Sequence, residues 1–229
     1  MEATQNAQWT IDLSVAVGPQ LRRILRERII RADLTPGSLL SEAEIARSYA
    51  VSRQPVREAF IKLAEEGLVE VRPQRGTVVR KISRSQVMDA RFVREAVEAD
   101  IVKLLAKCID RAAISELRKL LALQKEAAKG DRIRFMELDD QFHRTLAAAA
   151  GRGGAWHVIE ESKAQMDRVR FLSFGQFPMD KLIAQHEAVV DAVAEGRTDD
   201  AEASMRGHLR EVLVDLPKIA EAVPDYFEA

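Results

Sequence analysis

The first third of the chain shows apolar positions at helical spacing, separated by short polar breaks. Apolar residues recur every three to four positions over 15–32, which predicts an amphipathic helix. Ser41 and Glu44 form a capping box, which predicts a second, short helix over about 42–48. A serine and a glycine bound a third apolar pattern over 52–66. Three helices with this spacing are typical of a helix-turn-helix.

Two stretches rich in β-forming residues follow, at 68–71 and 77–79. The turn between them ends in Gly76, which can adopt a positive φ, so we expect a β-hairpin, the wing of a winged helix-turn-helix. Residues 1–14 are polar and aperiodic, and we expect a flexible arm there. The winged helix-turn-helix is therefore expected over 15–82.

The rest of the chain, 83–229, is dominated by helical periodicity. The predicted helices cover residues 85–107, 110–129, 131–149, 153–174, 179–194 and 198–216. Hydrophobic residues make up 47% of the chain and aromatic residues 5%, an aliphatic composition that favours helices packed on helices. We therefore expect a mainly α protein whose C-terminal domain is an all-α antiparallel helical bundle.

Charge separates the two predicted domains. Residues 15–84 contain 14 Lys and Arg against 8 Asp and Glu, whereas residues 85–229 contain 21 against 26. The basic domain is the one that would face phosphates. A single cysteine, Cys108, excludes a disulfide framework and a cysteine-rich metal site, and we expect it to be a buried thiol. Without a long apolar stretch or a signal-like N-terminus, the sequence predicts a cytoplasmic protein and no membrane partner.

Polar side chains gather where the third helix begins. Ser52, Arg53, Gln54 and Arg57 lie in or just before its first turns. In a helix-turn-helix, side chains at this position can reach phosphates, and an arginine can bind guanine with two hydrogen bonds in the major groove. The alternative is that the two arginines are only solvated charges on a helix.

This first domain closely resembles the winged helix-turn-helix of the GntR family of bacterial transcription regulators. The resemblance rests on four motifs: Leu-Ser-Glu-Ala-Glu-Ile-Ala from Leu40, Val-Ser-Arg-Gln-Pro-Val-Arg-Glu-Ala-Phe from Val51, Leu-Ala-Glu-Glu-Gly-Leu-Val from Leu63 and Arg-Gly-Thr-Val-Val from Arg75. It implies that double-stranded operator DNA is a partner and that Arg53 and Arg57 are the main base or phosphate contacts. It also implies that Arg75 and Gly76 bring the wing tip to the minor groove. Many relatives have an arginine where this chain has Ala43, so one usual contact is missing.

Three of the four histidines occur one per predicted helix in the second domain. His143 shares a helix face with Asp139, four residues before it, while His186 and His208 lie on later helices that a bundle can bring inward. Three imidazoles and one carboxylate suit a divalent transition metal such as Zn, Ni or Mn. Taken singly, each histidine is better explained as a hydrogen-bonded structural or surface residue than as a ligand, and the metal prediction depends on the group. His157 is expected to be structural.

The second domain resembles the ligand-binding domain of the FadR subfamily. The matching segments are Phe135–His143, Asp167–Leu172, the stretch that starts at His186, and Ala201–Leu209. The resemblance implies that the three histidines and the aspartate bind one metal, and that Arg94 stands at the family's Arg-x-x-x-Glu position. An effector, expected to be a carboxylate, would bridge the metal and Arg94, with Arg168 and Arg170 as further candidates. The alternative for Arg94 is a salt bridge to Glu98 along its helix.

The sequence therefore predicts a homodimeric transcription regulator, most often a repressor in this family, whose operator affinity depends on an organic acid bound at the metal site. A dimer is expected because one recognition helix reads only a half-site. The main alternative is a metal-dependent hydrolytic enzyme that carries a winged-helix domain. His186 and Glu187 begin a metalloprotease motif, but residue 190 is valine, and neither a Gly-rich phosphate loop nor a Gly-x-Ser-x-Gly elbow is present. A winged helix used only for protein interaction is a second alternative.

Overall fold

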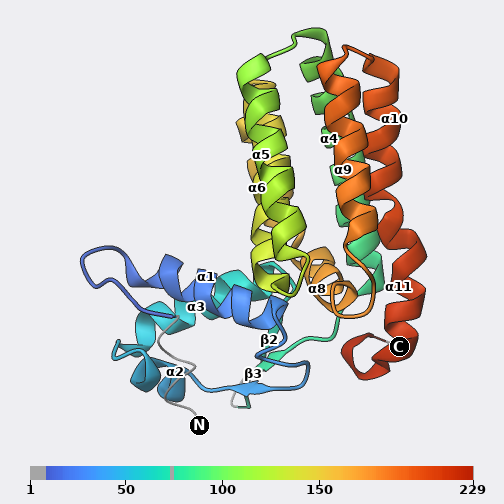
Figure 1. Cartoon of the computed structure of the whole chain (residues 1–229). Helices are drawn as coiled ribbons and strands as arrows, with labels where there is room; N and C mark the ends of the chain where they lie inside the picture. Colours follow the sequence, from blue (N-terminus) through green and yellow to red (C-terminus); the bar gives the residue numbers. More distant parts are fainter. Residues whose placement is uncertain (1–8, 73–74, 229) are drawn as a thin grey trace. The chain divides into compact units, whose positions relative to one another are not determined.

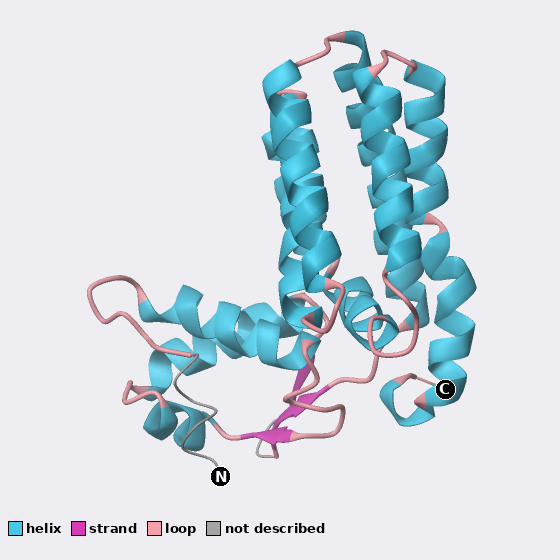
Figure 2. Ribbon diagram, viewed as in Figure 1, coloured by secondary structure: helices cyan, strands magenta, loops and turns pink. Residues whose placement is uncertain are grey.

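The computed structural model describes residues 9–72 and 75–228, which form two compact units (Figure 1). Unit 1 comprises Met1–Ser83 together with Asp225–Ala229, and unit 2 comprises Arg84–Pro224. Figure 2 shows that the strands all belong to unit 1 and that unit 2 is helical throughout its described elements. None of the described helices combines the length and the apolar character that crossing a membrane requires.

Unit 1 contains three helices and a small sheet. Its elements are α1 (Val17–Ile30), β1 (Leu39–Leu40), α2 (Glu42–Ser48), α3 (Arg53–Glu65), β2 (Val69–Arg72) and β3 (Gly76–Val79). The side chain of Ser41 accepts a hydrogen bond from the backbone N–H of Glu44, so the predicted cap of α2 is present. Ser52 occupies the N-cap position of α3, but its side chain makes no capping hydrogen bond. Its hydroxyl therefore has no role in holding the helix end.

The sheet of unit 1 is antiparallel, with the strand order β1-β3-β2, and β2 and β3 form the predicted hairpin. The register pairs Val69 with Val79 and Arg72 with Gly76. Gly76 has a φ of +85°, and a Cβ at this position would lie 3.0 Å from Cδ1 of Leu39, so glycine suits the turn on both counts. Strand β1 was not predicted, because two residues are too few to show an alternating pattern.

The last residues of the chain return to unit 1. The backbone N–H of Ile82 donates to the carbonyl of Tyr226 at 2.7 Å, and the N–H of Glu228 donates to the carbonyl of Ile82 at 3.0 Å. The side chains of Ile82 and Phe227 are buried. This differs from the expected division, which placed the whole of 83–229 in the C-terminal domain. One bridge and one buried ring produce no periodic pattern in a sequence, so the return of the chain could not be read from it.

The N-terminal segment also differs from the expected flexible arm. Trp9 is buried, and the guanidinium of Arg31 lies over its ring, 5.2 Å from the centroid. Trp9 therefore packs on unit 1, because a tryptophan gains by burying its large apolar surface, whereas most of residues 10–14 are exposed. The remainder of the expected arm, residues 1–8, lies outside the described residues.

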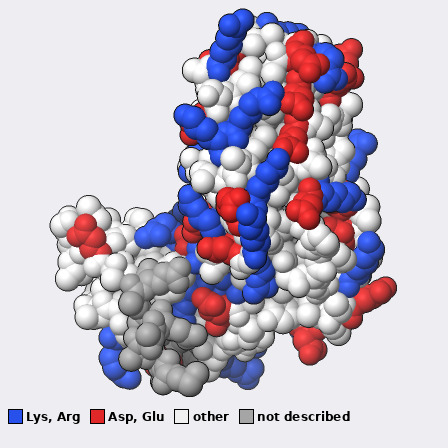
Figure 3. Space-filling model, in the orientation of Figure 1, with Lys and Arg blue, Asp and Glu red and all other residues white. Residues whose placement is uncertain are grey.

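Unit 2 is a helical bundle, in agreement with the predicted fold class. Its helices are α4 (Arg84–Lys107), α5 (Arg111–Ala127), α6 (Arg132–Ala149), α7 (Gly153–Ser162), α8 (Ala164–Ser173), α9 (Asp180–Ala194), α10 (Thr198–Leu209) and α11 (Glu211–Ala222). Helix α10 packs against α4 and α9, while α5 packs against α6 and α9. On the face drawn in Figure 3, basic and acidic side chains occur side by side on the exposed helices. The bundle core is aliphatic, as the composition predicted.

Two of the predicted helices are divided. The helix expected over 153–174 is broken at Lys163 into α7 and α8, and the one expected over 198–216 is broken at Arg210 into α10 and α11. Neither break has a glycine or proline, so the helical pattern continues across both. At the first break the side chain of Lys163 is buried and donates to Asp140 and Asp167. That is a tertiary contact which local sequence does not reveal.

Cys108 is exposed, which contradicts the expectation of a buried thiol. Helix α4 ends at Lys107, so residue 108 lies in the connection to α5 and not on the apolar face of a helix. The apolar sequence around Cys108 suggested burial, but Cys108 lies beyond the end of α4, and its side chain is exposed to solvent.

Candidate metal centre

Three histidines from three helices of unit 2 converge through their Nε2 atoms. Nε2 of His208, on α10, lies 3.2 Å from Nε2 of His186 on α9 and 3.3 Å from Nε2 of His143 on α6. All three side chains are buried. Packing of the bundle thus brings together residues that are 22 to 65 positions apart along the chain.

The opposite ring nitrogen of each histidine faces an oxygen atom. The pairs are Nδ1 of His143 with Oε2 of Glu98 at 2.5 Å, Nδ1 of His186 with Oε1 of Gln124 at 2.9 Å, and Nδ1 of His208 with Oε1 of Gln185 at 3.2 Å. The amide nitrogen of Gln124 donates to the carbonyl of Leu138, and that of Gln185 donates to Glu211, so both amide oxygens are directed at the rings. The two glutamine oxygens place the proton of His186 and of His208 on Nδ1, so Nε2 of each of these rings presents a lone pair.

Two of the three imidazoles, those of His186 and His208, have pKa values below the ordinary value. Burial, together with the nearby charges of His143 and Arg170, lowers the pKa of His186 to about 3, although Asp139 acts in the opposite direction. Burial and the two neighbouring histidines also lower the pKa of His208. The lone pairs of His186 and His208 are directed at each other and repel, and a cation between the rings would remove the repulsion. The ligand atoms of His143, His186 and His208 lie close enough together to hold one metal ion.

Asp139 lies beside the histidines. Its Oδ1 is 3.6 Å from Nε2 of His186, and its Oδ2 is 3.7 Å from Nε2 of His143. Two ligand atoms that each lie about 2.1 Å from an ion are roughly 3.0–3.4 Å apart, so the two nitrogen separations match and the oxygens are a few tenths of an ångström longer. Oδ2 is also paired with the guanidinium of Arg170, which leaves Oδ1 available. Asp139 thus lies next to His143, His186 and His208, the three residues whose ligand atoms are close enough together to hold one metal ion.

Arg94 and Glu98 form the salt bridge that the sequence left open as an alternative. Nε of Arg94 donates to Oε1 of Glu98 at 2.6 Å, and both side chains are buried. Burial alone would raise the pKa of Glu98, but the charges of Arg94 and His143 lower it to about 2. Nη2 of Arg94 is buried without a hydrogen-bond partner among the described residues. The ion pair therefore leaves one donor of Arg94 unused.

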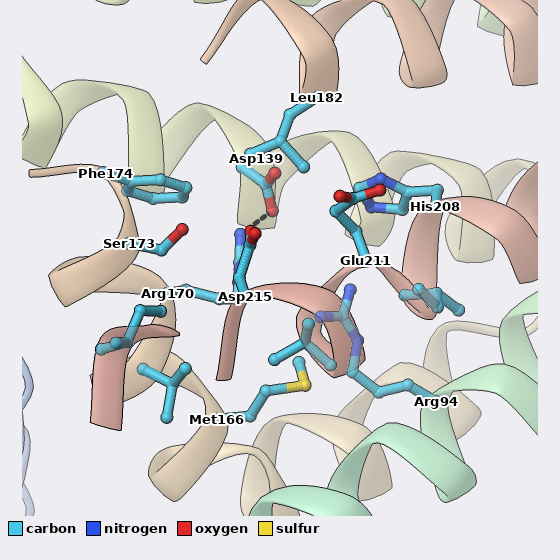
Figure 4. Close-up of a pocket in the computed structure, with 14 residues that line it drawn as sticks. Arg94, Asp139, Met166, Arg170, Ser173, Phe174, Leu182, His208, Glu211 and Asp215 are labelled. Carbon is cyan, nitrogen blue, oxygen red and sulfur yellow. Dashed lines mark hydrogen bonds and ion pairs between the residues drawn. The ribbon is translucent and has the colours of Figure 1, made fainter. Parts of the chain in front are cut away.

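A cavity of about 50 Å³ lies next to the histidines. Arg94, Asp139, Arg170 and His208 are among the residues that line it, and Figure 4 shows them around the same space. Two of the three candidate effector residues are thus brought to one cavity. Arg168 is buried but does not line it, because residues two apart on a helix point in different directions.

The candidate DNA contacts lie on the surface of unit 1. The exposed residues at the start of α3 and at the hairpin are Ser52, Arg53, Gln54, Arg57, Arg75 and Gly76. Nε and Nη2 of Arg57 each donate to a different carboxylate oxygen of Glu42, both at 3.1 Å. Gln54 donates to Glu58 at 3.0 Å. Residues 73–74, which complete the wing tip, lie outside the described residues.

Both units of the chain match known protein families. Residues 19–79 match the model of the bacterial regulatory proteins of the gntR family, and residues 89–211 match the FCD domain. The chain belongs to the GntR family of bacterial regulatory proteins. This regulator is 40% identical over 213 residues to the HTH-type transcriptional repressor RspR of Escherichia coli (strain K12), a match that covers 92% of this chain and 93% of that protein.

Solved structures share the fold of the regulator. It is similar to a GntR transcriptional regulator from Rhodococcus sp. RHA1, with a TM-score of 0.70, 26% identity and coverage of 91% of this chain and 99% of that chain. E. coli McbR/YncC gives a TM-score of 0.76 at 18% identity, over 89% of this chain and 98% of that chain. The GntR-family regulator is a DNA-binding transcription regulator and not an enzyme, since its matched relatives are transcription regulators. The hydrolase alternative is thereby set aside.

Sequence reasoning missed the residues that orient the histidines. Gln124 is fully buried and follows Leu117, Leu120 and Leu121 on the apolar face of α5, so a glutamine at a core-facing position was the available signal. Gln185 gave no such signal, because it is only the neighbour of a histidine. Trp156 was also missed, although its ring is parallel to that of His143 with centroids 6.1 Å apart. His157, in contrast, is exposed, and its Nε2 lies 3.6 Å from Oε1 of Glu161.

Proposed function

We propose that this GntR-family regulator is a repressor that holds a divalent transition metal and responds to a small organic acid. The metal ligands are Asp139, His143, His186 and His208. The observation that carries the proposal is the convergence of three Nε2 atoms, in which glutamine oxygens orient the rings of His186 and His208 and Glu98 lies beside Nδ1 of His143. When bound, the metal would supply positive charge and open coordination positions for a carboxylate oxygen. The name of the E. coli relative supports repression.

The cavity beside the histidines is the proposed effector site. Arg94 has a buried, unpartnered Nη2, and a guanidinium donates well to carboxylates. Arg170 lines the same cavity and is held by Asp139 and Asp140. The effector's carboxylate would therefore lie between the metal and Arg94, with Arg170 next to Asp139. Arg168 is left out of this proposal because it does not line the cavity.

Effector binding would change the arrangement of the helices around the cavity. A volume of about 50 Å³ accommodates only a few water molecules, so an acid of four or more carbons must displace side chains or a helix of the wall. Residues of α8 and α11 form much of that wall. A ligand that binds one arrangement of these helices better shifts the population toward it, and operator affinity changes if the two arrangements differ in affinity.

For DNA binding, we propose that α3 enters the major groove with Ser52, Arg53, Gln54 and Arg57 toward the bases and phosphates. Arg75 and Gly76 would approach the minor groove. Two chains related by a twofold axis would read the two halves of a palindromic operator. Size-exclusion chromatography with light scattering should give twice the mass of one chain, and a monomer bound alone to a complete operator would contradict this arrangement.

The metal assignment is tested by replacing one buried histidine of the cluster and, as a control, one exposed histidine outside it. His186→Ala removes a buried ligand, so metal content measured by elemental analysis should fall well below that of the wild-type protein. His157→Ala changes an exposed histidine and should leave metal content unchanged. Both variants should keep the helical circular dichroism of the wild type. Equal metal content in the two variants would show that the converging histidines are not the site.

A further inference from the structure

Helix α11 contributes two carboxylates to the wall of the cavity, and neither is among the proposed metal ligands. Glu211 and Asp215 lie one turn apart on α11, and Figure 4 shows both beside the space that Arg94 and His208 also line. Effector recognition by Arg94 alone does not require acidic residues in the same cavity. The two acidic residues therefore indicate which chemical group the effector carries in addition to its carboxylate.

The two carboxylates differ in how many hydrogen bonds their oxygens already accept. Oε1 of Glu211 accepts from Nζ of Lys181 at 2.5 Å, and Oε2 accepts from Gln185 at 3.0 Å. Asp215 accepts a hydrogen bond from the Ser173 side chain. A carboxylate has about four acceptor positions, so Asp215 can accept further donors. Burial and the negative charge of Glu211 raise the pKa of Asp215, so an added donor would relieve an unfavourable charge.

The remaining wall of the cavity is apolar. Its hydrocarbon side chains come from Met166, Val169, Phe174, Leu182, Leu209, Val212 and Ile219. The cavity thus offers one unused cationic donor on Arg94, one carboxylate acceptor on Asp215, and surfaces suited to a carbon chain.

We infer that the effector is a monocarboxylic acid that also carries a hydrogen-bond donor, a hydroxyl or an ammonium group, which binds Asp215 while the carboxylate binds Arg94. The inference rests on the proposed effector site and names the chemical class of its ligand. A dicarboxylic acid would place its second carboxylate against Asp215, and like charges in a partly buried site weaken binding. Asp215 is therefore the residue that selects between the two classes.

Matched acids test this selection on the full-length protein loaded with Zn²⁺. The first pair is D-gluconate and D-glucarate, which differ only in a terminal hydroxyl or carboxylate. The second set is 4-hydroxybutyrate, 4-aminobutyrate and succinate. Isothermal titration calorimetry should show that a donor-bearing acid of at least one set binds at least about 10-fold more tightly than the dicarboxylate of that set. Comparison of the hydroxy and amino acids identifies the donor.

Asp215→Asn is the discriminating variant, because an amide can donate to a carboxylate and removes the repulsion. In this variant, the ratio of the affinity for the donor-bearing acid to that for the dicarboxylate should fall to less than about threefold, mainly because the dicarboxylate binds more tightly. Asp191→Asn makes the same chemical change on α9 at a residue that pairs with Arg118 and does not line this cavity, and it should keep the wild-type preference.

Three results would overturn the inference: equal or tighter binding of the dicarboxylates by the wild-type protein, no binding of any of the five acids, or an unchanged preference in Asp215→Asn. Metal content and operator binding are measured on the same samples. If they are intact while the preference is absent, the ligand class is wrong and the proposed metal-dependent regulator stands. If metal is also absent, the proposed function fails as well.

Discussion

Two histidines of the converging cluster, His186 and His208, are each oriented by a glutamine oxygen, and this contact decides which ring nitrogen faces the centre. For His186 the oxygen belongs to Gln124, which lies 2.9 Å from Nδ1 and is itself held by the carbonyl of Leu138. A histidine without such a partner can place its proton on either nitrogen. We therefore expect metal affinity to depend on residues that do not contact the metal.

Replacing Gln124 with methionine should show this dependence. The variant keeps the side-chain volume but loses the acceptor, so Zn²⁺ affinity should fall by about 10- to 100-fold while the bundle remains folded. Competition with a chromophoric chelator measures the affinity. Gln141→Met, at an exposed position of α6, is the control and should bind as the wild type does. Wild-type affinity in Gln124→Met would mean that the glutamine is not required.

The neutral state of His186 has a consequence for acid stability. The pKa of His186 is lowered to about 3 in the folded protein, below its ordinary value of 6.5. Between these values the unfolded chain takes up a proton that the folded one does not, so the free energy of unfolding of the metal-free protein should decrease as the pH falls. The slope approaches about 1.4 kcal/mol per pH unit for one such group. Urea titrations at several pH values of the wild type and His186→Gln measure it, and an identical slope in both would contradict the assignment.

Helices of unit 2 were well predicted where glycine ends them. A glycine with a positive φ follows each of α5, α6 and α9, namely Gly130, Gly151 and Gly196. Such glycines are typical of helix C-termini, so these helix ends could be predicted from the sequence. The breaks at Lys163 and Arg210 have no glycine. There the helical pattern is continuous, and only tertiary contacts decide where one helix stops and the next begins.

Helix α3 is the element on which operator recognition is proposed to depend. Arg53→Ala should weaken operator binding by about 1–3 kcal/mol if the guanidinium contacts a base edge, while the unit stays folded because the side chain is exposed. Fluorescence anisotropy with a labelled operator measures the change. Lys62→Ala removes the same charge near the other end of α3, where Lys62 pairs with Glu65, and should have a much smaller effect. Equal losses in both variants would indicate a general effect of charge.

At the scale of the whole molecule, unit 1 is completed by the far end of the chain. Phe227 is buried in unit 1, so Phe227→Ala should lower the free energy of unfolding of that unit by about 3–4 kcal/mol. Trp9 reports on unit 1 by fluorescence in a Trp156→Phe background. Glu228→Gln, which disrupts only an exposed pair with Arg80 at 3.2 Å, should cost no more than about 1 kcal/mol. A Phe227→Ala protein as stable as Glu228→Gln would show that the tail is dispensable.

Residue patterns were enough to predict the mainly α fold, the winged helix-turn-helix with its hairpin, and the family, because periodicity, caps and glycines act over a few residues and the DNA-binding motifs are contiguous. It also named Asp139 and the three histidines as one group. The tertiary structure alone decided which atoms of those side chains meet, that Gln124 and Gln185 orient them, that Asp215 shares a cavity with Arg94, and that Phe227 joins unit 1. Such contacts join residues far apart in the chain, and they depend on how whole helices pack.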